Sequence, residues 1–447
     1  SMSNNYKGPT EDFAMVVPVP VVLQEEQVKT LPPGVFDKID ALSAPRLVEY
    51  WEKDPCAPDY AERRRLGSAK GGARPSAAPK RKADEDYGVT VEAQFTVGEY
   101  TVVILSAKEA TGLDQWLRDN KYQIPAGADA ALAPYIQEGM KFFVAKVDIE
   151  KVKRDAEGTV VLSPLRFDFE SPELRLPVRL GLLNANGKQD LIVYTLHPSS
   201  RFEVANYPNV FIPTNIEVLD EVRERFGSFY TALFDKTLAL SDGKAIVTEY
   251  SWQAGKCDPC PVPPLQDSDL FTLGGDVLIG GGRGPAQLAV PGAPGRPPRP
   301  MRRRRPSGPF FGSGSSWVLT RLHTRYSKDT LSEDLVFKPA PPVVGGRARW
   351  DGTSMENPGE VKRDGQNNFQ GRYIIRHYWE GPVACDDPRW DRWGGPGGQG
   401  KPGNKASAAT GLGSAKRTPI ALEKIVRSKL DSHGLPGLPI PGKGKRK

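Results

Sequence analysis

Stretches rich in glycine and proline divide this chain and limit what it can fold into. Together these two residues make up 88 of the 447 positions, against roughly 12% in an average protein. They concentrate in places, and fill 18 of the 39 positions in 274–312. Glycine is costly to order, and proline interrupts helices and sheet ladders. The core must therefore be assembled from separate segments, and a content of 38% apolar residues is enough to build one.

The same stretches predict how folded and flexible segments alternate. We expect an N-terminal strand and helix of the main domain in 1–66, a flexible insertion in 67–86, the main α+β domain in 87–273, an arm rich in Pro, Gly and Arg in 274–315, strands that return to the main domain in 316–392, a linker in 393–417, an amphipathic helix in 418–432 and a basic tail in 433–447. This organisation favours one main domain with insertions over several independent domains.

Alternation of apolar and polar residues predicts that strands dominate the fold. The run 89–97 has the period of a half-buried strand, and the turn after it leads into a second strand over 100–105. The apolar run 13–23 contains prolines at 18 and 20, so we expect it to be extended and to lie at a sheet edge or at a bulge. The fold class predicted is α+β, with an antiparallel sheet or sandwich and one long helix.

Local signals also predict a helix and a hairpin within the main domain. Apolar residues at helical spacing over 214–234 predict the long helix, with Thr214 as its N-cap. The strand-like runs 176–183 and 190–196 flank Asn186-Gly187. Both residues of that pair tolerate positive φ, so the pair predicts a tight hairpin turn.

The cysteines lie in three loops, each of which follows a tryptophan at short range. They are Cys56, Cys257, Cys260 and Cys385. We expect the three loops to meet at one edge of the fold, joined by two disulfides that each close a loop of over a hundred residues. In the chain-entropy model such closures stabilise by roughly 3–5 kcal/mol each. Structural disulfides imply an oxidising compartment.

Other roles for the cysteines stay open but fit less well. A redox-active Cys-x-x-Cys pair needs a helix N-terminus, and the prolines after Cys260 oppose a helix there. A zinc site made of four cysteines usually has two close pairs, and this chain has one. Free structural thiols would leave the repeated tryptophan unexplained.

Basic charge is confined to two short patches. The net charge is +7, and two patches of four charges account for more than that, which leaves −1 for the rest. The patches are Arg302, Arg303, Arg304 and Arg305, and Lys443, Lys445, Arg446 and Lys447. A specific nucleic-acid surface spreads basic residues along one face, so we do not expect one here. We interpret the arginine run as an arm that binds a partner or an acidic polymer.

Motifs for catalysis are sparse. The sequence has four histidines and lacks a His-Glu-x-x-His helix, a Gly-x-Ser-x-Gly elbow and a phosphate-binding Gly-Lys-Ser/Thr loop. We therefore predict no catalytic residue, no metal and no cofactor. His323 and His377 each lie in a strand beside arginines, and they are the pair to test as a polar site if their strands are neighbours.

The C-terminal segment predicts an amphipathic helix on a tether. Thr418 can cap it and Pro419 suits its first position. Its apolar side consists of Ile420, Leu422, Ile425, Val426 and Leu430. Such a helix docks either on its own domain or on another chain, and the second case would make the protein a component of an assembly.

Four strings together resemble a bacterial family catalogued as domain of unknown function 2330. They are NNYKGPTEDFAMVVPVPVVLQ (4–24), SAPRLVEYWEKDPC (43–56), TLHPSSRFEVANYPNVFIPTNIEV (195–218) and TRLHTRYSKDTLSEDLVFKPAPPVVGGR (320–347). The resemblance spans most of 4–390 and implies a secreted or envelope protein made with a signal peptide, as in actinobacteria and myxobacteria. It carries no activity onto any residue.

These observations predict an exported envelope or surface protein, located in the periplasm, on the outer-membrane surface or outside the cell. We expect a non-catalytic binding or structural component of a larger assembly, whose arms and C-terminal helix dock on partner chains. No run of 18 apolar residues is present, so we expect no transmembrane segment. The alternative is an exported hydrolase with a site around His323 and His377.

Overall fold

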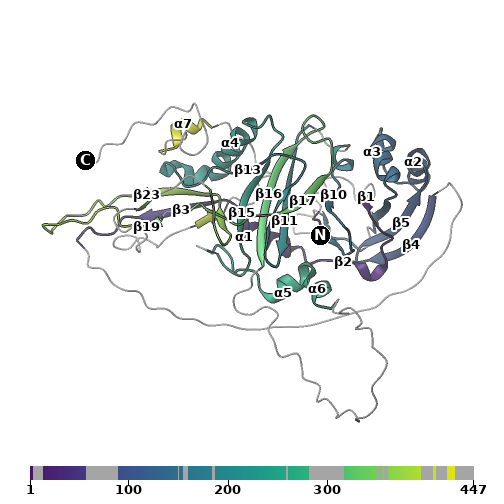
Figure 1. Ribbon diagram of the computed structural model, residues 1–447, viewed down its shortest axis with the longest axis horizontal. Coiled ribbons are helices and arrows are strands. Elements are labelled where there is room, and N and C mark those ends of the chain that lie inside the picture. The colour runs from purple at the N-terminus through teal and green to yellow at the C-terminus, as the bar shows by residue number, and fades with distance from the viewer. Residues whose placement is uncertain are drawn as a thin grey trace, which may run out of the picture.

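The computed structural model has an α+β fold in which strands dominate, as predicted from the sequence (Figure 1). It describes residues 1–3, 14–56, 89–148, 151–154, 160–183, 187–257, 260–280, 317–347, 349–350, 355–356, 361–393, 406–408 and 420–427. No helix in these ranges is long and apolar enough to cross a membrane.

The strands are β1 (Ala14–Val19), β2 (Val28–Thr30), β3 (Arg46–Trp51), β4 (Val89–Val97), β5 (Tyr100–Ala107), β6 (Lys141–Val147), β7 (Lys153–Arg154), β8 (Val160–Val161), β9 (Leu165–Phe167), β10 (Leu174–Leu176), β11 (Gln189–His197), β12 (Arg201–Val204), β13 (Asn209–Phe211), β14 (Ile216–Glu217), β15 (Ile246–Gln253), β16 (Val318–Tyr326), β17 (Leu335–Ala340), β18 (Val343–Gly345), β19 (Arg349–Trp350), β20 (Met355–Glu356), β21 (Lys362–Arg363), β22 (Asn368–Gln370), β23 (Arg372–His377) and β24 (Ala406–Ala408).

The α-helices are α1 (Gly34–Ser43), α2 (Ala110–Asp119), α3 (Ala128–Gln137), α4 (Phe226–Ala239), α5 (Asp267–Leu270), α6 (Asp276–Gly280) and α7 (Leu422–Ile425). Short 3-10 turns are η2 (Glu25–Gln27), η3 (Leu180–Leu182) and η4 (Asp220–Arg225), and η5 (Phe271–Gly275) is a π-helical turn between α5 and α6.

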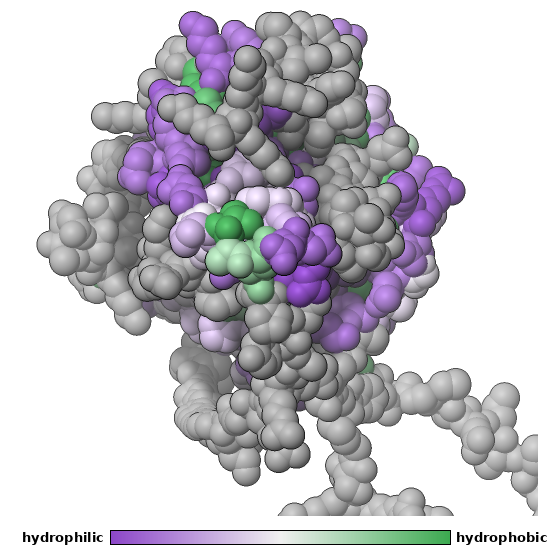
Figure 2. Space-filling view, turned by 90° about the vertical axis from the view of Figure 1, so that its left-hand side faces the viewer, coloured by the Kyte–Doolittle hydropathy of each residue, from purple (hydrophilic) through white to green (hydrophobic). Residues whose placement is uncertain are grey.

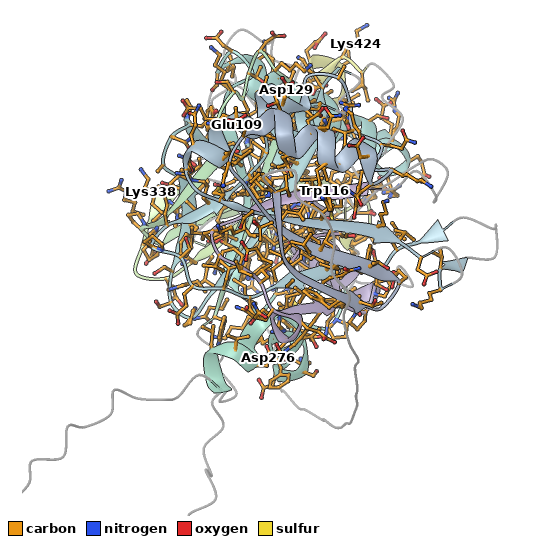
Figure 3. All side chains as sticks on the ribbon, turned by 90° about the vertical axis from the view of Figure 1, so that its right-hand side faces the viewer. Glu109, Trp116, Asp129, Asp276, Lys338 and Lys424 are labelled. Atoms are coloured by element: carbon orange, nitrogen blue, oxygen red, sulfur yellow. A yellow bond between two sulfur atoms is a disulfide. The ribbon has the colours of Figure 1, made fainter. Side chains whose placement is uncertain are left out.

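One four-stranded sheet, in the order β1-β6-β5-β4, forms the right-hand end of the molecule in Figure 1. Alternate residues of β5 serve two cores: Val102 and Ile104 face the side of β2 and β9, and Val103 and Leu105 pack against α2 and α3. Figure 3 views this end, where the two helices lie across the sheet. The 89–97 hairpin and the proline-containing edge strand β1 are both confirmed.

A seven-stranded sheet, in the order β11-β16-β15-β22-β18-β21 with β13 beside β15, forms the centre. Every residue of β16 is buried. One face of the sheet packs against the three-stranded sheet β10-β17-β12, where Leu322 contacts the core of that sheet. The other face lies under α1 and α4, which contribute Asp40 and Tyr230 to contacts with the strands.

A fourth sheet, β14-β23-β3-β24, extends the α4 core toward the left of Figure 1. β23 pairs in parallel with both β14 and β3, so segments far apart in sequence become neighbours. Tyr373 on β23 packs among the aromatic rings of α4, including Phe229 at a ring-centroid distance of 5.0 Å. This arrangement places the end of β23 beside the end of β3.

Two local predictions were wrong because long-range strand pairing overrides local spacing. The long helix begins at Phe226 rather than near Thr214, because Ile216–Glu217 is held extended as β14. Thr214 does not cap a helix and instead donates its hydroxyl to the Gln370 carbonyl. The hairpin expected around Gly187 does not form, since β11 pairs with β16 and β10 pairs with β17.

Two segments expected to be linkers contain regular structure in their described parts. Residues 274–280 complete η5 and form α6, whose Asp276 pairs with Arg166 and Lys29 at 2.7 and 2.9 Å. Residues 406–408 form β24 against β3. The insertion 67–86 and the tail 433–447 lie outside the described residues.

The C-terminal helix docks on its own chain in the structure, which is one of the two cases that the sequence leaves open. α7 spans four residues instead of the predicted fifteen of 418–432. Leu422, Ile425 and Val426 are buried in the core of α4, with Ile420 packed against it. The Leu219 amide donates to the Ile425 carbonyl, and the Arg427 amide donates to the Glu217 carbonyl. Leu430 lies outside the described residues.

Shortening Ile425 to alanine tests this docking. Ile425 is 2% exposed, so Ile425→Ala should lower the free energy of unfolding of the isolated chain by about 2–4 kcal/mol. Urea unfolding of the purified protein measures this, with Val21→Ala at an exposed position as the control. An unchanged midpoint for Ile425→Ala would show that the segment is not docked in the isolated chain.

Candidate functional site

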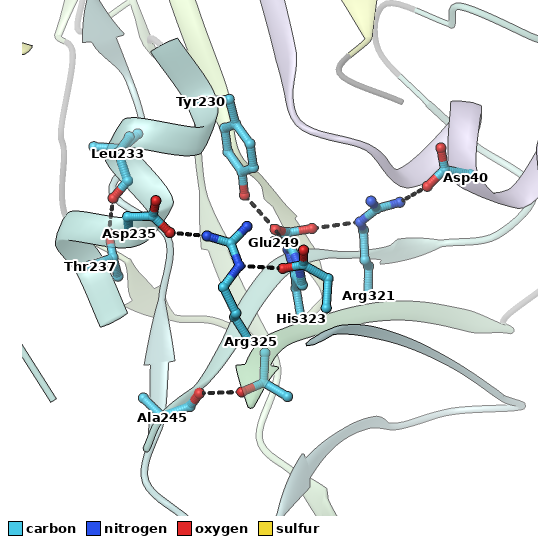
Figure 4. A network of polar contacts seen from close by, with 12 residues as sticks. Asp40, Tyr230, Leu233, Asp235, Thr237, Ala245, Glu249, Arg321, His323 and Arg325 are labelled. Atoms are coloured by element: carbon cyan, nitrogen blue, oxygen red, sulfur yellow. Dashed lines mark hydrogen bonds and ion pairs between the residues drawn. The ribbon is translucent and has the colours of Figure 1, made fainter. Parts of the chain in front are cut away.

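A connected group of ionisable side chains lies between the seven-stranded central sheet and the helices α1 and α4 (Figure 4). We call it the carboxylate network. Its members are Asp40, Asp190, Tyr230, Asp235, Glu249, Arg321, His323 and Arg325. They come from α1, β11, α4, β15 and β16, so the network connects every layer on this side of the sheet.

Strand geometry explains how the basic members come together. Arg321, His323 and Arg325 alternate along β16, so their side chains point to one face of the sheet. On the neighbouring strand β15 the register shifts between Thr248 and Tyr250. This bulge leaves Glu249 without a cross-strand partner in the register and directs its carboxylate toward the basic residues of β16.

Glu249 is the centre of the network. Its Oε2 accepts a hydrogen bond from Nε of Arg321 at 2.5 Å. Its Oε1 accepts one from the Tyr230 hydroxyl and lies 2.6 Å from Nδ1 of His323. The side chains of Glu249 and Arg321 are 0% exposed and that of His323 is 1% exposed, so water does not reach these contacts.

His323 lies between two carboxylates. Its Nε2 is 3.3 Å from Oδ1 of Asp190, and its ring stacks on Phe234 at a centroid distance of 4.0 Å. A carboxylate only accepts hydrogen bonds, so both ring nitrogens must carry protons to satisfy Glu249 and Asp190 together. The geometry therefore fits an imidazolium.

The pKa shifts of His323 and Glu249 also favour the charged forms of both groups. Burial alone would lower the pKa of His323, but Glu249 and Asp190 outweigh burial and raise it above its usual 6.5. Burial alone would raise the pKa of Glu249, but His323 and Arg321 lower it to about 2. Both shifts favour the charged forms, and each group stabilises the charge of the other.

Two outer ion pairs complete the network. Arg325 donates to Asp190 at 2.7 Å and also pairs with Asp235 of α4. Arg321 pairs with Asp40 of α1, and its Nη1 lies 3.0 Å from the Tyr194 hydroxyl. The guanidinium groups therefore fasten both helices to the sheet.

This geometry suits a structural role better than a reacting one. A general acid or base must reach the substrate, within about 3 Å or through one water. His323 is 1% exposed and Glu249 is 0% exposed, so both side chains are closed off from solvent. His323 was predicted from the sequence as a candidate site residue, and Glu249, Arg321 and Asp190 were not. For Arg321 the signal was a basic residue or histidine at every second position of β16.

The network predicts how stability depends on pH. The raised pKa of His323 means that its contribution is complete below about pH 6.5 and is lost as pH rises through the raised value. The lowered pKa of Glu249 means that its contribution is complete above about pH 4.5 and is lost as pH falls toward about 2. Urea unfolding from about pH 3 to 8.5 should therefore show greatest stability near pH 5–6.5.

Replacing His323 isolates the alkaline part of this profile. His323→Gln should lose about 3–5 kcal/mol at pH 6, because it leaves a buried charge without its partner. It should also show a flatter decline between about pH 6.5 and 8.5. The control is His197→Gln. His197 accepts hydrogen bonds from the backbone amides of Ser199 and Ser200 and is not a member of the carboxylate network. Equal alkaline slopes in His323→Gln and wild type would contradict the assignment.

His377 belongs to a separate group at the fourth sheet. β16 and β23 lie in different sheets, so the structure does not bring His323 and His377 together as one site. His377 Nε2 lies 2.8 Å from Glu49, which also accepts two hydrogen bonds from Arg223 at 2.9 and 2.7 Å. Burial alone would raise the pKa of Glu49, but Arg223 and His377 outweigh burial and lower it. The His377 ring stacks on Trp51.

An aromatic loop, residues 378–393, follows directly after His377. Three of its side chains are large, apolar and exposed: Tyr378 at 41%, Val383 at 43% and Trp390 at 37%. Figure 2 shows the end of the molecule where β3 and β23 lie, with a small apolar surface bordered by hydrophilic surface. The sequence contains a signal for this loop, because Trp379, Trp390 and Trp393 flank Cys385. From the sequence alone the tryptophan near each cysteine is interpreted only as a sign of disulfides.

The cysteines form two disulfides, but only one joins distant segments. Cys56 pairs with Cys385 across 329 residues, and Cys257 pairs with Cys260 across three. The expectation that both close long loops, with three loops joined at one edge, is therefore wrong. Cys257 and Cys260 lie in a proline-rich part of the sequence after β15, where their short separation lets the thiols meet without joining distant segments.

The remaining predicted site residues lie elsewhere. Arg302, Arg303, Arg304 and Arg305 are outside the described residues, as is the basic tail. Within the described ranges, no group of three or more His, Cys, Asp or Glu side chains is arranged to hold a metal ion.

Comparison with known proteins identifies a family. The model of the family described as "uncharacterized protein conserved in bacteria (DUF2330)" matches residues 1–338. The chain belongs to the DUF2330 family. No curated protein and no solved structure matches. The resemblance noted in the sequence is confirmed, and the match contains Glu249, Arg321, His323 and Arg325. The aromatic loop and Cys385 lie beyond the matched residues of the DUF2330 model.

The two disulfides should differ in their effect on stability. In the chain-entropy model, closure of a loop of 329 residues stabilises by roughly 5 kcal/mol or more, and closure across three residues by about 2 kcal/mol. We expect the double variant C56S/C385S to lose at least about 3 kcal/mol, and C257S/C260S to lose about 2 kcal/mol or less. Urea unfolding without reductant measures both. Equal losses would argue against the Cys56–Cys385 pairing.

Proposed function

We propose that this protein is an exported, non-catalytic component of an envelope or surface assembly, and that it binds a partner protein through the aromatic loop. The observation that carries the proposal is the combination of exposed aromatic side chains with a rigid frame. Exposed large apolar groups on a fixed surface are costly in water, and on monomeric proteins such patches commonly mark binding sites.

The frame holds the loop at both ends. The two carboxylate oxygens of Glu52 accept hydrogen bonds from the backbone amides of Trp379, at 3.1 Å, and Asp391, at 2.7 Å. The Lys53 amide donates to the Arg392 carbonyl at 2.8 Å. Because Glu52 and Lys53 follow β3 directly, the loop is fixed to the C-terminal end of β3, an interior strand of the fourth sheet.

The middle of the loop is held as well. The Cys56–Cys385 disulfide ties Cys385 of the loop to the segment after β3. The Arg389 amide also donates to the Pro55 carbonyl at 3.0 Å. At its end Trp393 packs against Tyr378 with ring centroids 5.1 Å apart. A surface fixed in this way loses little conformational entropy when it binds, so more of the contact energy becomes affinity.

The composition of the loop suits a protein partner. Tryptophan, tyrosine and arginine are the residues most often found at the energetic centres of protein interfaces. The loop also carries four acidic residues, Glu380, Asp386, Asp387 and Asp391, against Arg389 and Arg392. We therefore expect a partner whose surface offers a pocket for an aromatic ring and basic side chains around it.

The Cys56–Cys385 disulfide supports export. Disulfides persist in oxidising compartments and are rare in the cytosol. The pairing fastens the aromatic loop itself, so reduction would loosen the proposed binding surface along with the fold. We favour this function over an exported hydrolase, because His323 and His377 lie in different networks.

Native mass and composition in the source organism test the proposal. Gently extracted protein should run as a defined particle larger than the 48.9 kDa chain, and it should contain another identified chain in fixed ratio. Trp390→Ala should release that chain, with a loss in affinity of at least about tenfold if Trp390 lies at the centre of the interface.

The matched control is Phe271→Ala, which removes an exposed aromatic ring outside the loop. It should leave the particle intact. A wild-type protein that runs as a lone chain under the same extraction, or a particle that Trp390→Ala and Phe271→Ala affect equally, would contradict the proposal.

A further inference from the structure

We infer that the outer edge of β11 is a pairing site for β11 of a second copy of this chain, which would join two central sheets into one. This inference is independent of the aromatic loop. It starts from the pairing of β11, which lies at one end of the seven-stranded sheet. β11 is bonded to β16 along one edge in a register of nine residues without a bulge. Among the described residues no strand pairs with its other edge.

Burial shows that this edge faces solvent. All nine residues of β11 are half-buried, whereas all nine residues of its neighbour β16 are buried. Figure 1 shows β11 on the side of β16 that is turned away from β15. The two strands share the same packing on both faces, since Val193 and Tyr194 of β11 contact opposite cores. The difference in burial therefore comes from the free edge of β11.

Other sheet edges in the described structure carry features that block pairing. β1 contains Pro18, which cannot donate to a ladder. β4 has a register shift between Val91 and Ala93 and exposes polar residues at every second position. The edge strands β10, β12, β14 and β24 have between two and four residues. A long edge without such protection is a template for another strand.

β11 has none of these protections. Its sequence, QDLIVYTLH, contains no proline, glycine or lysine. Its one acidic residue, Asp190, is neutralised by Arg325 at 2.7 Å and His323 at 3.3 Å. The strand therefore offers unpaired backbone groups flanked by apolar side chains and carries no repelling charge.

The sequence of β11 is complementary to itself, which selects a second copy as the occupant. In an antiparallel pair centred on Val193, that residue faces its own copy and Ile192 faces Tyr194. Leu191 then faces Thr195, and the ends pair Asp190 with Leu196 and Gln189 with His197. β-Branched and aromatic pairs stabilise antiparallel strands, and no like charges oppose each other here. The two-fold axis makes both contributions identical, as in most homodimers.

Sedimentation of the purified full-length chain tests the inference. We expect a monomer–dimer equilibrium between about 1 and 100 μM. Thr195→Lys should weaken dimerisation at least about tenfold, because lysine is one of the residues by which natural edge strands prevent pairing with another strand. The matched control is Thr96→Lys on the protected edge of β4, which should leave the equilibrium unchanged.

Hydrogen exchange locates the interface in the wild-type protein and does not depend on how well a variant folds. Amides in 189–197 should exchange more slowly at about 100 μM than at about 1 μM, because the outward-facing N–H groups become bonded. A chain that stays monomeric throughout overturns the inference, as does a dimer in which these amides exchange equally fast at both concentrations. Slow exchange in 189–197 that requires a different bound protein assigns the edge to another partner and also overturns it.

Discussion

The buried carboxylate of Glu249 is the contact on which the centre of this structure depends. A carboxylate removed from water is costly unless charges and hydrogen bonds replace its hydration. Here Arg321, His323 and Tyr230 supply them, and the arginines extend the same contacts to α1 and α4. The positions of two helices and three strands are therefore fixed by one set of charges, and loss of any inner partner would expose the remaining charges to an apolar interior.

This arrangement separates the charged interior from the surface that we propose for binding. The centre of the carboxylate network, Glu249 with Arg321 and His323, is buried among protein contacts. The aromatic loop instead presents Tyr378, Val383 and Trp390 to solvent. The loop is nevertheless tied to the same framework, since β3 contributes Glu49 to the His377 group and Glu52 follows it to hold the loop backbone. The paired strands β3 and β23 therefore fix the position of the aromatic loop relative to the core, and the Cys56–Cys385 disulfide adds a covalent link.

The sequence pattern correctly predicted those strands whose conformation depends on residues close together in the chain. The alternation in 89–97 and the prolines of the first strand were sufficient, because side-chain period and proline geometry act within a few residues. The helix start was wrong because Ile216–Glu217 pairs with β23, which lies over 150 residues later. Glu249 was missed because a bulge in β15 directs it, and a bulge leaves no mark in the apolar pattern. The cysteine pairing was open from sequence, since four cysteines allow three pairings.

The protonation state of His323 is the most direct test of the central claim that the buried centre of the network is fully charged and structural. The chain has four histidines, so selective ¹⁵N labelling and NMR can resolve their ring nitrogens. The account predicts that the His323 ring keeps both nitrogens protonated to a higher pH than an ordinary histidine, whose pKa is about 6.5, and that this signal is lost in His323→Gln. A His323 ring that titrates near pH 6.5 like a solvent-exposed histidine would contradict the account, because water would then reach Glu249 and the network would be open to react.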